Sequence, residues 1–217
     1  MNTPLLSVLR KFREFSCSES DQGTRFEKLM VRYLQTDPVY KDRFSGVWLW
    51  TDWKWREHTA DQGIDIVAQE AATGDYVAIQ CKCYAEDHTL SLQDVGTFFS
   101  TMNMMWNTEQ GKVSFARGII IATTNKWNDK ILKTIDLQQK PCAKITLNDL
   151  ETSGIDWEAC ASAADADLKV KPHYEPKRQQ QDAIDEVLQK FQAADRGKLI
   201  MACGTGKTYT SLCIAED

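Results

Sequence analysis

Three polar side chains interrupt two segments of the chain that are otherwise apolar. Asp65 lies within GIDIVAQE, and Gln80 and Lys82 lie within YVAIQCKC. A polar side chain among apolar strand residues costs free energy unless it is paired or used. Carboxylate and amide oxygens are suitable Mg²⁺ ligands, and a lysine beside the metal can orient or deprotonate a water and balance the charge of a phosphate. The three residues therefore have the chemistry needed for metal-assisted phosphodiester hydrolysis.

Each of these residues also has a simpler interpretation. Asp65 could cap a turn, and Gln80 and Lys82 could form the solvent face of an edge strand. His58 and His88 flank the segment, and we assign them no role. The tryptophans at 48, 50, 53 and 55 could stack on bases, although packing at the core and edge of a sheet is the favoured interpretation.

The elements that position these residues follow from the hydrophobic pattern. Strands over 64–69 and 76–83 flank a Thr-Gly-Asp turn, and Gln80 and Lys82 share one face of the second strand because side chains alternate. Apolar residues at helical spacing predict a helix over 21–35. We further expect helices at 3–15, 91–107 and 126–139, and strands within 46–55, 117–124 and 143–150. This order predicts a mixed α/β layer architecture.

The spacing D-(x)14-Q-x-K resembles the variant PD-(D/E)xK signature of Mrr-like restriction endonucleases, in which Gln replaces the first acidic residue of the second half-motif. The segments GIDIVA, AIQCK and RGIIIATT follow in the family's order, and TRFEKLM resembles its upstream helix. The similarity covers roughly residues 20–150. It implies a restriction-endonuclease-like mixed sheet flanked by helices, with double-stranded DNA as substrate.

The same resemblance implies roles for individual residues. Asp65 and Gln80 would hold Mg²⁺, Lys82 would assist the attacking water, and Glu27 would be an accessory acidic group. Asp61 matches an acidic position of the family, with turn chemistry as its first role and the metal shell as its second. Gln93 on the following helix is a further candidate contact.

A second motif, ACGTGKT at 202–208, follows an apolar segment predicted as a strand over 198–202 and opens a helix. Backbone N–H groups of Gly204, Thr205, Gly206 and Lys207 would bind phosphate oxygens at the helix N-terminus. Lys207 would reach the β and γ phosphates of ATP, and the Thr208 hydroxyl would ligate Mg²⁺.

Met201 occupies the first glycine position of the general phosphate-binding loop, and the resulting form resembles that of superfamily 2 helicases and translocases. In EPKRQQQDAI, Gln180 resembles the glutamine with which that superfamily contacts adenine, and Gln181 is the alternative. No second acidic motif, second lobe or arginine finger follows the loop, so we do not expect this chain to be a competent ATPase.

The predicted organisation is a nuclease domain at 1–150, a linker or docking segment at 151–176, and the truncated start of a superfamily 2 ATPase domain at 177–217, with the first strand, loop and helix of a RecA-like fold. This order resembles type ISP single-polypeptide restriction-modification enzymes. The resemblance implies a longer parent, with a helicase motor, a methyltransferase and a target-recognition region as the partners of this chain.

The composition is that of an ordinary globular protein, with 42% hydrophobic and 26% charged residues and a formal net charge of −5. No apolar run long enough to span a membrane occurs, and seven cysteines without zinc-site spacing predict a reduced, cytoplasmic protein. The alternative functions are a catalytically silent DNA-binding or docking module, and an ATP-binding regulatory domain.

Overall fold

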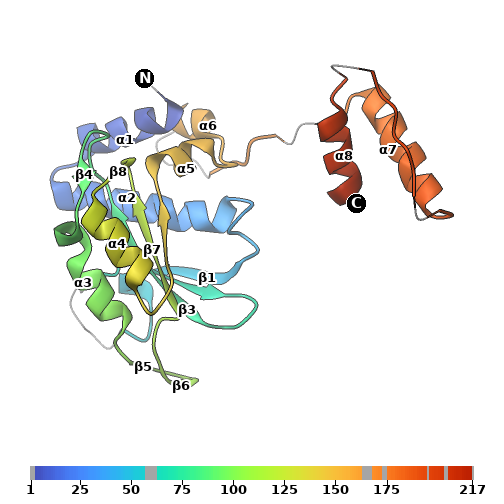
Figure 1. Cartoon of the computed structure of the whole chain (residues 1–217). Coiled ribbons are helices and arrows are strands. Elements are labelled where there is room, and N and C mark those ends of the chain that lie inside the picture. The colour runs from blue at the N-terminus through green and yellow to red at the C-terminus, as the bar shows by residue number, and fades with distance from the viewer. Residues whose placement is uncertain are drawn as a thin grey trace. The chain divides into compact units, whose positions relative to one another are not determined.

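The structure, a computed structural model, describes residues 3–56, 63–162, 168–172, 175–194, 196–202 and 205–216. The chain divides into two compact units, Met1–Lys171 (unit 1) and Pro172–Asp217 (unit 2). Figure 1 shows the elements of each unit.

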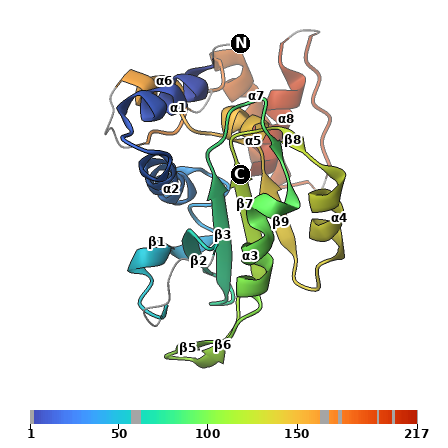
Figure 2. The same ribbon diagram turned by 90° about the vertical axis from the view of Figure 1, so that its left-hand side faces the viewer.

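Unit 1 is built on a five-stranded sheet with strand order β1-β2-β3-β7-β9. The strands β1 (Phe44–Leu49), β2 (Ile66–Glu70) and β3 (Tyr76–Lys82) pair in antiparallel fashion. Strands β7 (Arg117–Ala122) and β9 (Cys142–Ile145) continue the sheet from β3 in parallel. Figure 2 shows the strands side by side. The sheet is therefore mixed and flanked by helices, which confirms the predicted fold class.

Helices cover both faces of the sheet and divide the core in two. The helices α1 (Pro4–Phe15), α2 (Glu19–Thr36), α5 (Leu147–Thr152) and α6 (Trp157–Ser162) contribute to one core, which holds Val77, Ile79 and Cys81 of β3. The helices α3 (Leu92–Met102) and α4 (Asp129–Leu137) form the other core with Ala78. Because side chains alternate along β3, Gln80 and Lys82 point to the α3 and α4 side.

Two helices are shorter than predicted. The expected helix over 91–107 ends at Met102, where the Asn103 side chain donates to the Phe99 carbonyl. The chain then forms a hairpin of β5 (Trp106–Thr108) and β6 (Gly111–Val113). The expected helix over 126–139 begins at Asp129, because residues 126–127 form β8 (Lys126–Trp127), which pairs with β4 (Thr89–Leu90).

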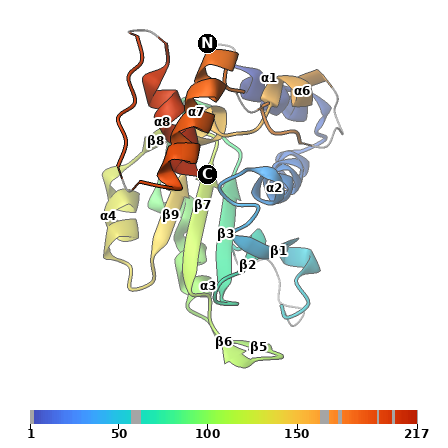
Figure 3. The ribbon, with the colours of Figure 1, turned by 90° about the vertical axis from the view of Figure 1, so that its right-hand side faces the viewer.

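The segment after β9 folds back onto the beginning of the chain. Helix α6 packs against α1, and the Thr3 hydroxyl donates a hydrogen bond to Glu151. The buried carboxylate of Asp37 accepts the Gly154 backbone N–H at 3.1 Å. An antiparallel bridge between Ile155 and Val170 closes the segment. The described residues 147–162 and 168–171 are thus packed in unit 1, with α1 and α6 side by side in Figures 1 and 3.

Unit 2 contains α7 (Arg178–Phe191) and α8 (Lys207–Glu216), which pack on each other. The prediction of a strand over 198–202 is wrong, because these residues form no strand in the structure. A strand needs a hydrogen-bonded neighbour, and the described residues of unit 2 include no other strand.

No helix among the described residues is long and apolar enough to cross a membrane. Six cysteines of the described part of the chain are free thiols.

Candidate functional site

Asp65 lies directly before β2, beside the end of β3 that carries Gln80. The antiparallel pairing of β2 and β3 begins at Ile66, which pairs with Ile79. The Asp65 N–H donates to the Ile79 carbonyl at 2.9 Å, and the Asp65 carbonyl accepts the Trp50 N–H at 2.7 Å. The Asp65 carboxylate accepts the Cys81 backbone N–H at 2.6 Å. Three contacts to the neighbouring strands therefore fix this half-buried aspartate.

Gly63 permits the approach of this segment to α3. Its φ is +81°, and a Cβ atom at this position would lie 2.5 Å from Thr97 Oγ1 and 3.1 Å from the Phe98 nitrogen. Glycine alone tolerates both the positive φ and the close packing. The chain can thus enter β2 beneath α3 with Asp65 at the strand end.

Gln80 is a buried polar residue in an apolar strand. Its side chain is 2% exposed, and its Oε1 atom accepts no hydrogen bond from the described residues. A buried acceptor without a donor costs about 1–3 kcal/mol. This cost requires an explanation, and a cation or a water at Oε1 would supply one.

Lys82 ends β3, two residues beyond Gln80 on the same face, and its side chain is half-buried. The buried Thr123, directly after β7, donates its N–H to the Lys82 carbonyl at 3.0 Å and its hydroxyl to the Tyr84 carbonyl at 2.7 Å. The neighbouring Thr124 hydroxyl donates to the His88 carbonyl at 2.6 Å. These two threonines hold the backbone around and after Lys82.

Sequence reasoning did not single out Thr123 and Thr124. The available signal was a pair of β-branched hydroxyl residues immediately after the apolar run RGIIIA. Hydroxyls at a strand end commonly satisfy backbone groups of the adjoining loop.

Glu27 is half-buried on α2, and its charge acts on the buried thiol of Cys81. Burial raises the pKa of the Cys81 thiol well above its ordinary value, the charges of Asp65 and Glu27 raise it further, and Lys82 lowers it. The charges of Glu27, Asp65 and Lys82 are thus close enough to Cys81 to act on its thiol. Cys81 and α2 lie on one side of β3, whereas Gln80 and Lys82 point to the other side.

The remaining candidates are placed less centrally or lie outside the description. Gln93 is exposed in the first turn of α3. His88 Nε2 lies 3.8 Å from an Asp94 carboxylate oxygen, and its ring lies 4.1 Å from that of Tyr84. Asp61 and His58 lie outside the described residues.

The donor set fits a hard divalent cation with few protein ligands. Among the described residues no three His, Cys, Asp or Glu side chains gather in a metal-binding arrangement. The pair of Asp65 and Gln80 supplies one carboxylate and one amide oxygen, and Mg²⁺ commonly keeps several waters beside one or two such ligands. The orphaned Gln80 Oε1 is the atom that such an ion would satisfy.

In unit 2 the candidate nucleotide residues lie around one loop. Gln180, which is 6% exposed, donates to the Thr205 carbonyl at 2.9 Å and accepts the Lys177 N–H at 2.9 Å. Lys207 donates to the carbonyls of Met201 and Ala202, each at 3.2 Å.

Gly206 has φ +83°, and a Cβ there would lie 2.4 Å from Gln180 Nε2. Thr208 is exposed on the first turn of α8, and Gly204 lies outside the described residues. Gln181, the alternative to Gln180, is exposed and donates to Asp185 at 2.8 Å. In this structure the Gln180 amide therefore joins the start of α7, through Oε1, to the loop, through Nε2.

Comparison with known proteins identifies two families along the chain. A restriction endonuclease family model matches residues 35–167, and a model described as type III restriction enzyme, res subunit, matches residues 173–217. No curated protein matches the chain.

Two solved structures are similar to this chain. The ATP-dependent type ISP restriction-modification enzyme LlaBIII bound to DNA is 31% identical, with a TM-score of 0.71. The similarity covers 100% of this chain and 13% of that enzyme. The MspJI restriction endonuclease in complex with a 27-mer oligonucleotide is 17% identical over 67% of this chain and 30% of its own, with a TM-score of 0.41. We base no argument on the second similarity.

Proposed function

Because the chain belongs to the restriction endonuclease family, we propose that unit 1 is a Mg²⁺-dependent DNA endonuclease whose site consists of Asp65, Gln80, Lys82 and Glu27. The substrate would be double-stranded DNA, and the reaction would hydrolyse a phosphodiester bond. The single observation that carries this proposal is the buried, unpartnered Gln80 Oε1, next in the chain to Cys81, whose N–H the Asp65 carboxylate accepts.

The residues divide the chemistry among them. Asp65 and Gln80 would hold the cation through one oxygen each, where β2 begins and β3 ends within the sheet. When bound, Mg²⁺ supplies Lewis acidity, which lowers the pKa of a water and offsets the charge of the phosphate. Lys82 would orient the attacking water by hydrogen bonding and add positive charge beside the phosphate. Glu27 would bind through water as an accessory acid.

The proposal is tested by nicking of supercoiled plasmid in Mg²⁺ or Mn²⁺. We expect wild-type protein to nick the plasmid, and Asp65→Ala and Lys82→Ala to lose at least about a hundredfold in rate, since electrostatic groups of this kind contribute that much. Asp75→Ala, which removes an exposed carboxylate from the β2–β3 turn, is the matched control and should cut normally.

Fluorescence anisotropy measures DNA binding by the same variants and distinguishes the nuclease from a module that only binds DNA. A wild type that binds duplex DNA but never cuts it, with or without the site substitutions, would indicate the catalytically silent DNA-binding or docking module. Equal nicking by wild type and Asp65→Ala would assign the cleavage to other residues.

For unit 2 we propose that residues 177–217 begin the ATPase domain of a longer parent, after a nuclease domain at 1–150 and a connecting segment at 151–176. The match to the res subunit family supports this proposal. In the parent, ATP with Mg²⁺ would bind at Gly204–Thr208 with Gln180 near the adenine, and helicase, methyltransferase and target-recognition regions would be the partners of this chain. Hydrogen exchange with and without Mg-ATP tests the loop, since protection of residues 205–208 should disappear in Lys207→Ala.

A further inference from the structure

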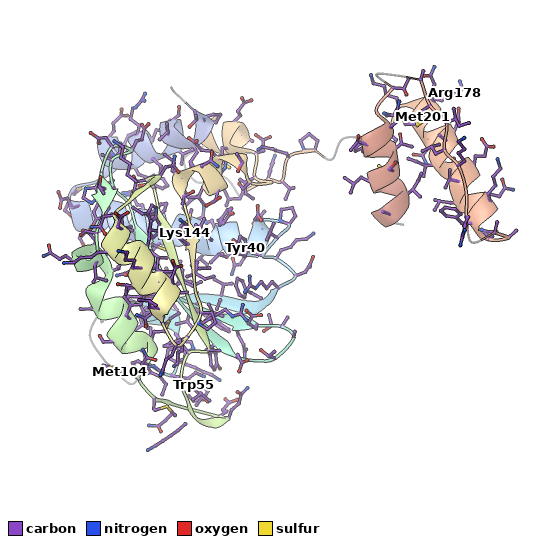
Figure 4. The ribbon with its side chains drawn as sticks, viewed as in Figure 1. Tyr40, Trp55, Met104, Lys144, Arg178 and Met201 are labelled. Carbon is purple, nitrogen blue, oxygen red and sulfur yellow. The ribbon has the colours of Figure 1, made fainter. Side chains whose placement is uncertain are left out.

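A pocket whose lining includes four aromatic side chains lies on unit 1. Its lining comes from β1, the 3-10 turn η1 (Trp50–Asp52) and the residues after it, β2, β3 and the β5–β6 turn. The lining residues are Trp48, Asp52, Trp53, Lys54, Trp55, Gln69, Tyr76, Glu109 and Gln110. Figure 4 places Trp55 at the same end of unit 1 as Met104, near the β5–β6 hairpin.

The aromatic walls are held in place by packing. The Trp48 ring lies over Gly46, where a Cβ atom would come within 2.2 Å of it. Trp53 meets Tyr76 edge-on with ring centroids 5.5 Å apart. Behind them the buried Trp50 and Trp106 pack on Trp53 at 5.5 and 5.7 Å. The buried Trp53 and Tyr76 form the rigid base of the pocket, and the partly exposed Trp48 and Trp55 are the rings available to stack on a planar ring.

Neutral hydrogen-bonding groups are available at the same place. Gln69 donates its Nε2 to the Gly74 carbonyl at 2.9 Å, which aligns its amide. Gln110 Nε2 lies 3.7 Å from the position that a Cβ on Gly74 would take, so the two amides meet there. The Trp53 side chain is 3% exposed, and its indole N–H finds no acceptor among the described residues. The two glutamine amides suit the edge of a nucleobase, whereas the indole N–H is buried beneath the pocket.

The charges of the pocket favour a neutral ring over an anion or a cation. Lys54 lies over the Trp55 ring at 4.3 Å and pairs with Glu109 at 2.8 Å, so this cation and this carboxylate already satisfy each other. Asp52 adds a negative charge that would repel a phosphate. The nearby Met104 and Met105 are 44% and 59% exposed and extend the apolar surface.

The pocket is linked to the candidate nuclease site through the same strands. Tyr76 and Gln80 lie on one face of β3 four residues apart, which corresponds to about 13 Å. Trp50, which packs on Trp53, donates its backbone N–H to the Asp65 carbonyl. We propose that this pocket binds an unstacked nucleobase of the DNA on which the Asp65, Gln80 and Lys82 site acts. This inference rests on the proposed function.

The test compares a short duplex carrying one extrahelical adenine with the same duplex fully paired. Binding is followed by fluorescence anisotropy without divalent cations, so that the DNA stays intact. We expect wild type to bind the duplex with the extrahelical base about tenfold more tightly, within the range known for base–aromatic stacking. Trp55→Ala should lose this preference, and Trp55→Phe should keep most of it.

Two further variants make the result specific. Phe15→Ala removes a 64% exposed aromatic ring from α1 and should leave the preference unchanged. Gln110→Ala, at an exposed turn position where folding is not at stake, should weaken binding of the extrahelical adenine without affecting the paired duplex.

Equal wild-type affinities for the two duplexes would overturn the proposal, as would equal losses in Trp55→Ala and Phe15→Ala. Plasmid nicking tests the proposed nuclease activity independently of this binding result. A preference for the extrahelical base in a protein that never cuts would leave the pocket standing and refute the nuclease.

Discussion

Replacing Gln80 by methionine should stabilise the protein while removing its activity. Gln80 is 2% exposed, and its Oε1 has no donor among the described residues. Methionine has a similar shape and no carbonyl to bury, so Gln80→Met should recover about 1–3 kcal/mol of unfolding free energy. For a domain of this size, each kcal/mol raises Tm by about 2–4 °C.

The assay is thermal unfolding followed by tryptophan fluorescence in EDTA and in Mg²⁺. All seven tryptophans lie between residues 48 and 157, so the signal reports unit 1 alone. In EDTA the variant should melt above wild type. With Mg²⁺ at a hundred times its Kd, wild type should gain about 2.7 kcal/mol. The variant lacks one of the two ligands, so Mg²⁺ should raise its unfolding free energy much less. The difference between the two melting temperatures should therefore become smaller or change sign.

The exposed Gln139, which follows α4, provides the matched control, because Gln139→Met removes the same amide without relieving any burial. It should leave Tm and its response to Mg²⁺ unchanged. A Gln80→Met variant that melts below wild type in EDTA would refute the reasoning, since it would mean that the amide is already satisfied within the fold. An identical Mg²⁺ response in wild type and Gln80→Met would remove Gln80 from the metal site.

Three other perturbations test the surrounding structure. Gly118→Ala should destabilise unit 1 by about 1–3 kcal/mol in urea titrations, because its Cβ would lie 2.7 Å from a methionine sulfur and 2.9 Å from a phenylalanine ring of α3. Cys81, whose thiol pKa is raised by burial, should resist iodoacetamide at pH 8 in the folded protein while the exposed Cys17 is alkylated, as mass spectrometry would show. Burial raises the pKa of Asp94, but hydrogen bonds from Ser91 outweigh it and hold this pKa below the ordinary 3.8. The ionised carboxylate therefore stabilises the fold above about pH 4, and this stabilisation is lost as the pH falls through the lowered pKa. In Asp94→Asn the unfolding free energy should consequently fall less steeply at acid pH than in wild type.

The hydrophobic pattern was sufficient to predict the main sheet and its flanking helices. Strand alternation set Gln80 and Lys82 on one face, and a helical stripe that includes Phe26 and Leu34 correctly predicted the buried side of α2. These signals are local and strong, because one face of each element is buried. The antiparallel pairing of β2 and β3 also followed, since a short turn fixes the register of two such strands.

Other features depend on contacts between residues distant in sequence. The segment after residue 150 has small residues and little periodicity, yet Asp37 binds Gly154 and Trp157 packs in the first core, which no local pattern reveals. The predicted helix over 91–107 was too long, because Met104 and Met105 are good helix formers and continue the helical pattern. In the structure the helix has already ended, and Trp106 packs into the second core, the one that contains Ala78. Of the four tryptophans between residues 48 and 55, Trp50 and Trp53 are buried in the core, whereas Trp48 and Trp55 are only partly buried. Tertiary packing decides this difference.

The packing of α6 on α1, with the Thr3 to Glu151 hydrogen bond, brings the first and last segments of unit 1 to one corner. A force applied from beyond residue 171 would load the Ile155–Val170 bridge and the α1–α6 contact before it reached the parallel pair of β3 and β7. Mechanical strain would be absorbed at that corner while Asp65 and Gln80 kept their alignment. The same closeness makes unit 1 a candidate for circular permutation, with a short peptide joining the segments around residues 3 and 171.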